Sequence, residues 1–162
     1  MKINTTINGK AVSLEINPNT MLADALRDAG YQGVKIGCRE GSCGACAVMI
    51  DGRPRNSCII PAGMAEGCEI LTVEGLGNPE EPHVLQKAFV ESGSTQCGYC
   101  NPGSLIAAKA LLDRNPNPTA EDVKDALDGN LCRCTGYVKR IAAVLEAAKA
   151  DKKTKKRAGG KK

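Results

Sequence analysis

The stretch Gly37-Cys38-Arg39-Glu40-Gly41-Ser42-Cys43-Gly44-Ala45-Cys46 decides the first half of this fold. Its cysteines follow the spacing Cys-x4-Cys-x2-Cys, which is typical of the plant-type [2Fe–2S] loop. Such short gaps let one loop turn three thiolates toward a single small anionic group, and Cys58 supplies a fourth after a further short segment. The sequence therefore predicts that Cys38, Cys43, Cys46 and Cys58 ligate a first [2Fe–2S] cluster.

Glycines interleave these cysteines. Gly37, Gly41 and Gly44 carry no Cβ and tolerate positive φ. Backbone N–H groups can then point at the cluster sulfurs and offset their negative charge, as in an anion nest. The alternative is a structural zinc site with four cysteine ligands, which prefers Cys-x2-Cys pairs. The spacing favours the cluster.

A second set of four cysteines follows downstream as Cys97-x2-Cys100 and Cys132-x1-Cys134. By spacing alone this set fits zinc as well as a second [2Fe–2S] cluster. Two features favour the cluster. A second redox group beside a first extends an electron path, and each pair precedes a predicted helix start, where free N–H groups face an anion.

The remaining metal-ligand candidates are few. A Rieske centre or a two-cysteine, two-histidine zinc finger needs two histidines, and the chain has only His83. We expect His83 to be exposed near a helix start. Cys68, the ninth cysteine, adjoins an apolar run, and we expect it to be buried as a small hydrophobic residue.

The first half of the chain reads as strands with one helix. Two hairpins are predicted, 2–7 with 11–16 across Asn8-Gly9 and 47–50 with 53–57 across Asp51-Gly52, because both dipeptides suit a tight turn. A helix capped by Thr20 lies between the hairpins and ends before Gly30. A short strand is predicted over 69–73.

The second half changes to a helical period. Pro102 opens the second of four predicted helices, and Thr119 caps the third. A Gly- and Pro-containing linker lies between Gly75 and Pro82. We therefore predict a β-rich domain over 1–76, a helical domain over 82–150 and a basic, disordered tail over 151–162.

Composition limits the classes of function. Seven of the 22 basic residues lie after residue 150, so the overall charge of +4 hides a body with a net charge of −2. Three Tyr, one Phe and no Trp leave few stacking residues, which argues against nucleic-acid binding. The sequence shows no export signal and no apolar run long enough to span a membrane, and we expect a reducing cytoplasm, where grouped cysteines bind metal. No nucleophilic triad, phosphate loop or dinucleotide-binding pattern is visible.

Three motifs resemble the small subunit of the molybdenum hydroxylases. They are the quoted loop 37–46, then Gln96-Cys97-Gly98-Tyr99-Cys100, and Leu131-Cys132-Arg133-Cys134-Thr135-Gly136-Tyr137, in that order and spacing. The family includes xanthine dehydrogenases, aldehyde oxidoreductases, carbon monoxide dehydrogenases and 4-hydroxybenzoyl-CoA reductases. The resemblance covers about residues 2–150. This chain has Asn101 where the family commonly has Thr.

The resemblance implies an α+β protein: an N-terminal β-grasp, plant-type ferredoxin-like domain for the first cluster and a C-terminal four-helix bundle for the second. It implies that Gln96 and Cys134 contact molybdopterin, in its plain or cytosine dinucleotide form, held by a large partner subunit. It also implies a medium subunit with FAD, a complex that dimerises, and one-electron relay between the molybdenum site and FAD or an external acceptor. A freestanding two-cluster ferredoxin and a zinc-stabilised interaction module are the rival interpretations.

Overall fold

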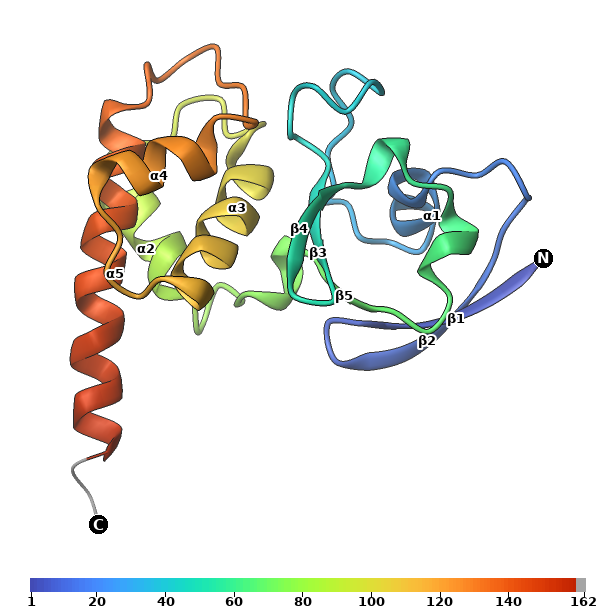
Figure 1. Ribbon diagram of the computed structural model, residues 1–162, viewed down its shortest axis with the longest axis horizontal. Helices are drawn as coiled ribbons and strands as arrows, with labels where there is room; N and C mark the ends of the chain where they lie inside the picture. The colour runs from blue at the N-terminus through green and yellow to red at the C-terminus, as the bar shows by residue number, and fades with distance from the viewer. Residues whose placement is uncertain (160–162) are drawn as a thin grey trace.

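The computed structural model describes the backbone of residues 1–159 and the side chains of residues 1–151. Its first half is built on a five-stranded mixed sheet with the order β2-β1-β5-β3-β4 (Figure 1). The strands are β1 (Lys2–Ile7), β2 (Lys10–Glu15), β3 (Ala47–Ile50), β4 (Arg53–Asn56) and β5 (Glu69–Leu71). The predicted α+β class, a ferredoxin-like sheet domain followed by helices, is confirmed.

Both predicted hairpins form where the turn dipeptides place them. Asn8 and Gly9 have φ values of 52° and 76°, and Asp51 and Gly52 have 48° and 76°. Two successive residues with positive φ are what a two-residue turn between twisted strands requires. The turns fix the register, with Ile3 opposite Leu14 in the first hairpin.

Strand β5 joins the two hairpins. It runs parallel to β1, pairing Ile70 with Ile7, and antiparallel to β3, pairing Leu71 with Met49. It is shorter than the predicted strand over 69–73, because the N–H of Thr72 donates to Asn8 Oδ1 at 2.9 Å and leaves the ladder. A 3₁₀ turn, η3 (Val73–Gly75), follows at once.

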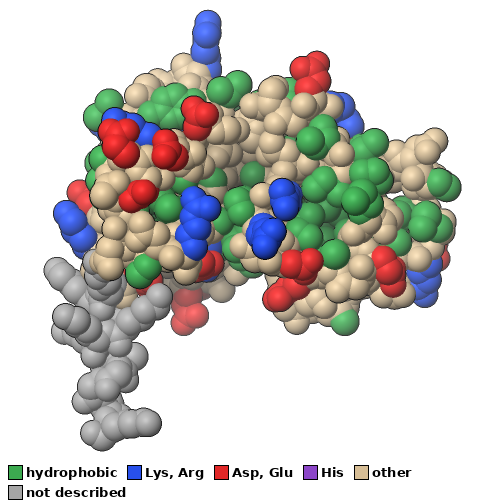
Figure 2. All heavy atoms as spheres, in the orientation of Figure 1, with side chains coloured by type: hydrophobic (Ala, Val, Ile, Leu, Met, Phe, Trp, Pro, Cys, Tyr) green, Lys and Arg blue, Asp and Glu red, His purple; other side chains and the backbone are tan. Residues whose placement is uncertain are grey.

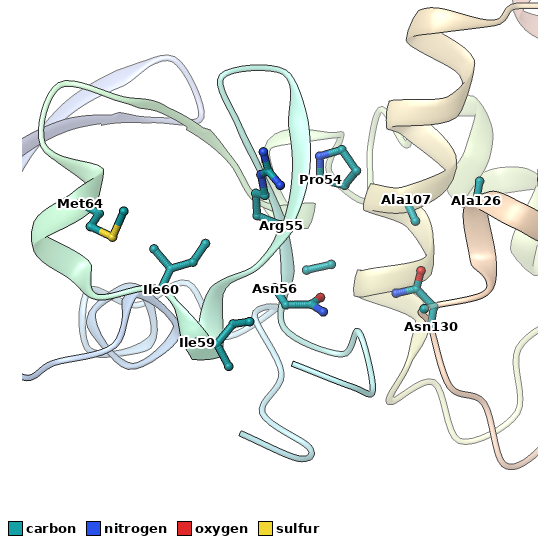
Figure 3. A pocket seen from close by; sticks show the side chains of 11 residues that line it. Pro54, Arg55, Asn56, Ile59, Ile60, Met64, Ala107, Ala126 and Asn130 are labelled. Atoms are coloured by element: carbon teal, nitrogen blue, oxygen red, sulfur yellow. The ribbon is translucent and has the colours of Figure 1, made fainter. Parts of the chain in front are cut away.

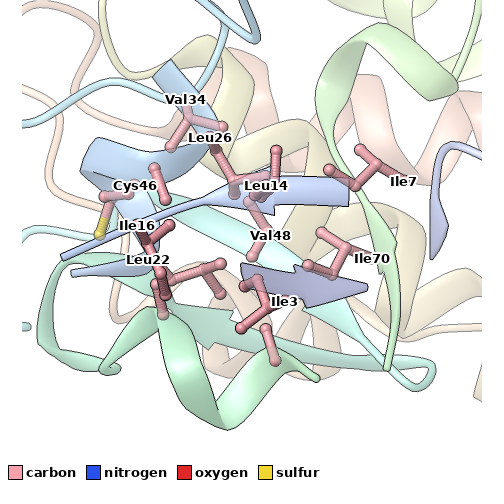
Figure 4. Close-up of a cluster of buried hydrophobic side chains, with 14 of the residues drawn as sticks. Ile3, Ile7, Leu14, Ile16, Leu22, Leu26, Val34, Cys46, Val48 and Ile70 are labelled. Atoms are coloured by element: carbon pink, nitrogen blue, oxygen red, sulfur yellow. The ribbon is translucent and has the colours of Figure 1, made fainter. Parts of the chain in front are cut away.

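Helix α1 (Leu22–Asp28) covers one face of this sheet, together with the 3₁₀ turns η1 (Ser57–Ile59) and η2 (Ala62–Ala65) (Figure 1). The predicted Thr20 cap is wrong: Met21 occupies the N-cap, and no side chain caps the helix. The segment before α1 instead pairs with the chain near Pro61, where the N–H of Ala62 donates to the Thr20 carbonyl at 2.9 Å. Apolar side chains of the sheet and α1 fill the space between them (Figure 4).

The second half holds α2 (Val84–Glu91), α3 (Asn101–Arg114), α4 (Ala120–Leu127) and α5 (Val138–Gly159), packed around their own apolar core. Thr119 caps α4 as predicted, its hydroxyl accepting from the Asp122 N–H at 3.2 Å. His83 is half-buried rather than exposed, because its Nδ1 accepts from the Leu85 N–H at 3.2 Å and caps α2.

The last helix continues beyond residue 150, where the sequence predicts that the helical domain ends. Of the predicted disordered tail over 151–162, residues 151–159 have helical backbone as part of α5, whereas residues 160–162 and all side chains after residue 151 lie outside the described part. Within the described part of the chain, no helix is long and apolar enough to cross a membrane.

The two halves pack directly against each other. Helix α3 lies along β3, and Ala47, Met49, Ile106 and Ala110 form a small apolar core between them. Figure 1 shows α3 facing the β3–β4 edge of the sheet. This packing brings the loop before β3 close to the loops that precede α3 and α5.

Candidate iron–sulfur centres

The first cysteine loop, residues 37–46, runs from beyond α1 to the start of β3. Arg39, Gly41 and Gly44 have φ values of 59°, 77° and 69°, so the loop turns through left-handed conformations at three points. A Cβ added to Gly37 would lie 2.9 Å from Cys43 Sγ, and one on Gly44 would lie 2.2 Å from the Gly129 carbonyl oxygen. A side chain at Gly37 or Gly44 would therefore clash with its neighbours. This agrees with the prediction that the loop needs residues without a Cβ.

Side chains hold this loop from both flanks. Arg39 forms a bidentate ion pair with Asp24 of α1, at 2.8 and 2.9 Å. On the other flank, the Ser57 hydroxyl donates to the Cys46 carbonyl at 2.7 Å, and the Asn56 side chain donates to the Gly41 carbonyl. The loop is therefore positioned by the sheet domain itself.

In the first set, Cys43 interacts with both Cys38 and Cys46, and Cys46 also interacts with Cys58. Hydrogen bonds from Ser42, from the backbone at Glu40 and Cys43, and from the Cys43 thiol lower the pKa of Cys38 to about 5. Burial, with the neighbouring Cys58 and Cys43 thiols, raises the pKa of Cys46 to about 11. The half-buried Cys38 thiolate with its donors, beside the buried and crowded Cys46 thiol, fits a metal group, because a bound cation supplies the charge that a buried thiolate lacks.

The second set lies at the ends of two loops. Cys97 and Cys100 precede α3, Cys132 and Cys134 precede α5, and Cys134 Sγ lies 3.6 Å from Cys97 Sγ. The Tyr99 N–H and the Cys134 thiol lower the pKa of Cys97. Burial raises the pKa of Cys132, but hydrogen bonds from Thr135 and from the backbone at Cys134 outweigh it and bring the pKa to about 7.

Cys100 completes this second set. It is buried, and burial together with a hydrogen bond to Cys132 raises its pKa. Arg140 acts in the opposite direction, with its Nη2 donating to Cys100 Sγ at 3.1 Å. The structure therefore brings all four predicted cysteines of the second set together, as it does those of the first.

Arg140 is a site residue that the sequence interpretation missed. It is the third residue of α5, and its side chain is 1% exposed. The available signal was its position on the helix, since it precedes the buried Val144 and Ala148 by four and eight residues and shares their face. The adjacent Lys139 makes the pair look like a solvated charge cluster.

Direct hydrogen bonds join the two cysteine loops. The N–H of Leu131 donates to the carbonyl of Cys43 at 2.9 Å, and Asn130 Nδ2 donates to the Gly44 carbonyl at 3.1 Å. A third contact comes from Tyr99, whose hydroxyl donates to the Ile36 carbonyl at 2.7 Å. Residues adjoining each set of thiols therefore touch residues of the other loop.

Gln96 and Cys134 lie side by side on the surface. Both are exposed, and Gln96 Nε2 donates to the Cys134 carbonyl at 3.1 Å. The amide oxygen has no intramolecular partner within the described part of the chain. A side-chain amide of this kind can both donate to and accept from a heterocycle edge.

Cys68 stands apart from both sets. It is half-buried rather than buried as predicted, and its Sγ lies 3.6 Å from the Met64 carbonyl oxygen. Burial and the nearby Asp51 raise its pKa. The 3₁₀ turn η2 before it ends in the exposed turn at Glu66-Gly67, which leaves one side of Cys68 open to solvent. Among residues 1–151, no three Cys, His, Asp or Glu side chains surround one point as ligands of a single metal ion.

A groove of about 630 Å³ separates η1 and η2 from α3 and α4 (Figure 3). Ile59, Ile60 and Met64 form one wall, and Ala107, Ala126 and Asn130 form the other. Ile59 is 53% exposed and also covers Gly41 of the first cysteine loop. Figure 2 shows hydrophobic side chains gathered on this face of the sheet domain.

Comparisons with known proteins identify the kind of group that each half of the chain binds. Residues 5–70 match a 2Fe-2S iron-sulfur cluster binding domain, and residues 72–145 match a [2Fe-2S] binding domain. These matches favour two [2Fe–2S] clusters and decide against zinc as the group bound by the helical half.

The chain is similar to named proteins over nearly its whole length. It is 51% identical to the nicotinate dehydrogenase small FeS subunit of Eubacterium barkeri, covering 90% of this chain and 93% of that one. It is 43% identical to the nicotine 6-hydroxylase small subunit of Paenarthrobacter nicotinovorans, covering 91% of this chain and 89% of that one.

Two solved structures share the fold. The match to quinoline 2-oxidoreductase from Pseudomonas putida 86 has a TM-score of 0.91 at 45% identity, over 94% of this chain and 96% of that chain. The match to the aldehyde oxidoreductase of Desulfovibrio gigas has a TM-score of 0.91 at 42% identity. It covers 95% of this chain but 17% of that chain, so there the fold is one part of a longer polypeptide.

Proposed function

The chain belongs to the family of small [2Fe–2S] subunits of molybdenum hydroxylases, and from this premise we propose how its own residues carry electron transfer. The first cluster is held by Cys38, Cys43, Cys46 and Cys58, and the second by Cys97, Cys100, Cys132 and Cys134. When bound, each cluster accepts and releases one electron. The subunit itself supplies ligation, hydrogen bonds and spacing rather than substrate chemistry.

The contact between the two cysteine loops carries this proposal. The carbonyl of Cys43 accepts from the N–H of Leu131, whose next residue is Cys132. One hydrogen bond and a few covalent bonds therefore connect Cys43, a proposed ligand of the first cluster, to Cys132, a proposed ligand of the second. The loops are kept at this separation by the packing of α3 on β3 and by the Asn130 side chain.

The loop backbones suit anionic groups. The Glu40 N–H lies 3.4 Å from Cys38 Sγ, and Thr135 Oγ1 lies 3.1 Å from Cys132 Sγ. Hydrogen bonds to cluster sulfurs stabilise the more negative, reduced form and so tune the reduction potential. The β-rich domain over 1–76 and the helical domain over 82–150 each contribute one such site in this proposal.

The exposed pair Gln96 and Cys134 marks the face that we assign to the electron donor. We propose that a large partner subunit presents molybdopterin here, that a medium subunit binds FAD, and that the complex dimerises. The Gln96 amide would hold the pterin edge, and Cys134 would be the ligand nearest to it. Nine unpaired cysteines support a reducing compartment, and we place the complex in the cytoplasm.

The test of cluster ligation pairs two cysteine variants of the anaerobically purified protein. Cys43→Ser should remove one of two electron paramagnetic signals and lower the iron and acid-labile sulfide content by half. Cys68→Ser, the matched control, should retain both signals. Two intact signals in Cys43→Ser, or loss of one in Cys68→Ser, would contradict the ligand assignment.

The pterin contact needs a separate test. In the purified complex, Gln96→Ala should leave both clusters reducible by dithionite but slow their reduction by substrate. The dithionite measurement is the internal control for cluster integrity. Substrate-driven reduction at the wild-type rate would remove Gln96 from the proposed electron entry.

A further inference from the structure

Arg140 is a buried cation with no carboxylate partner among the described residues. Its guanidinium donates to Ser104 Oγ and Asn101 Oδ1, both at 2.7 Å, and to Cys100 Sγ at 3.1 Å. Its carbon Cζ lies 5.7 Å from the centre of the Phe89 ring. The Nε–H is buried and has no acceptor within the described part of the chain.

Such a charge requires compensation. Arginine stays protonated in proteins, and a buried charge without an opposite charge nearby is strongly unfavourable. Hydroxyl and amide oxygens offer dipoles rather than a full negative charge. The Cys100 sulfur is the one contact of Arg140 that becomes anionic when it binds metal. A [2Fe–2S] group held by four thiolates is itself an anion and gains one more negative charge on reduction.

We propose that Arg140 sets the reduction potential of the second cluster, acting through Cys100. Its charge and its hydrogen bond favour the reduced form over the oxidised form, and so raise the potential. Arg140 is thus a positioning residue rather than a catalytic one. This inference rests on the proposed ligation of the second cluster by Cys97, Cys100, Cys132 and Cys134.

Among the side chains of residues 1–151, none plays an equivalent role at the first cysteine loop. Its adjacent cation, Arg39, has a side chain that is 59% exposed and already forms a bidentate ion pair with Asp24. Solvent and the carboxylate both screen that charge. The influence of a buried, uncompensated arginine is therefore confined to the second cluster.

The experiment measures the midpoint potentials of both clusters by dithionite titration of the full-length protein, followed by electron paramagnetic resonance. Arg140→Gln should lower the equilibrium constant for reduction of the second cluster by about tenfold or more. For a one-electron couple, a tenfold change lowers the midpoint potential by about 59 mV. In Arg140→Lys, the midpoint potential of the second cluster should stay close to the wild-type value, because the positive charge remains. Lys139→Gln, which removes an exposed charge from the same helix turn, should leave it unchanged.

A nearly isosteric second variant guards against misfolding of Arg140→Gln. Asn101→Asp keeps an oxygen for Arg140 and places a carboxylate beside it, so it should also lower the second cluster's potential. The first cluster's potential should stay constant in every variant. Wild-type potentials in Arg140→Gln or, should that variant not fold, in Asn101→Asp would overturn the role of Arg140.

The outcome also separates this inference from the ligand assignment. If both signals persist and the second potential does not move, Arg140 is structural and the proposed ligation stands. If the wild-type protein contains no second cluster, the proposed ligation itself fails. Iron and sulfide analysis of the same samples distinguishes these two results.

Discussion

The close approach of the two cysteine loops can be tested by adding a single methyl group. Gly103 lies in the first turn of α3, and a Cβ there would sit 2.1 Å from the carbonyl oxygen of Gly44 and 3.1 Å from Asn130 Nδ2. Ordinary contact begins at 3.4 Å, so Gly103→Ala must push the loops apart by about 1.3 Å along this line. Both contact partners are buried, and one is backbone that cannot rotate away.

Two effects of opposite sign determine the magnitude. Replacing Gly by Ala within a helix is favourable by roughly 0.5–1 kcal/mol when nothing obstructs the methyl group. Forcing extra volume into a packed interior costs roughly 1–3 kcal/mol. Because the obstructing atom is buried backbone, the upper part of that cost applies, and we expect the free energy of unfolding to fall by roughly 1–2 kcal/mol. For a protein of this size, that corresponds to a decrease of roughly 2–8 °C in the unfolding midpoint.

The assay compares the unfolding midpoint of cluster-loaded proteins under anaerobic conditions at one scan rate. The magnetic interaction between the two reduced clusters provides a second measurement, which should weaken as the loops separate. Gly129→Ala is the matched control, because a Cβ at this neighbouring, exposed glycine meets no atom within 4 Å. A Gly103→Ala protein as stable as the wild type, with unchanged coupling between the clusters, would refute the close packing of the loops.

Further predictions concern the contact between the halves and the helix caps. Tyr99→Phe removes the 2.7 Å hydrogen bond to the Ile36 carbonyl, and we expect a loss of roughly 0.5–1.5 kcal/mol in denaturant unfolding; an unchanged transition would mean that water replaces the hydroxyl at no cost. Thr119→Ala should destabilise α4 by about 1 kcal/mol, seen as faster amide exchange in that helix and not in α2. Hydrogen bonds from Thr119 lower the pKa of Asp122 below its usual 3.8. The contribution of the Asp122 carboxylate to the stability of α4 is therefore complete above pH 3.8 and is lost as the pH falls through the lowered pKa. The difference in α4 exchange between wild type and Asp122→Asn should accordingly shrink below pH 3.8, and a constant difference would contradict the cap.

Local chemistry determined what the sequence could predict. Asn8-Gly9 and Asp51-Gly52 require positive φ, and Thr119 has its partner three residues away, so short windows contained the whole interaction. The cysteine spacings were informative for the same reason. Thr20 has the residue type of a cap, but its neighbourhood is set by residues 60–62, some 40 positions away.

Long-range packing accounts for the rest. The Asn8 side chain accepts a hydrogen bond from the Thr72 N–H, which shortens β5. This interaction spans 64 positions, so no local sequence pattern contains it. Arg140 reaches Cys100 across 40 positions, and its burial became evident only once α3 and α5 were packed together. The contact of Leu131 with Cys43 depends on how the two halves dock, which the spacing of the motifs does not specify.

The central position of β5 has a consequence for how the protein matures. This strand leaves the ribosome after β1 to β4, yet it is the only strand that pairs with both β1 and β3 among those described. Until residues 69–71 are synthesised, the two hairpins cannot join, and the core on which Cys46 and Cys58 rest stays incomplete. Iron and sulfide delivered to the nascent chain before that point would meet cysteines that are not yet held in place.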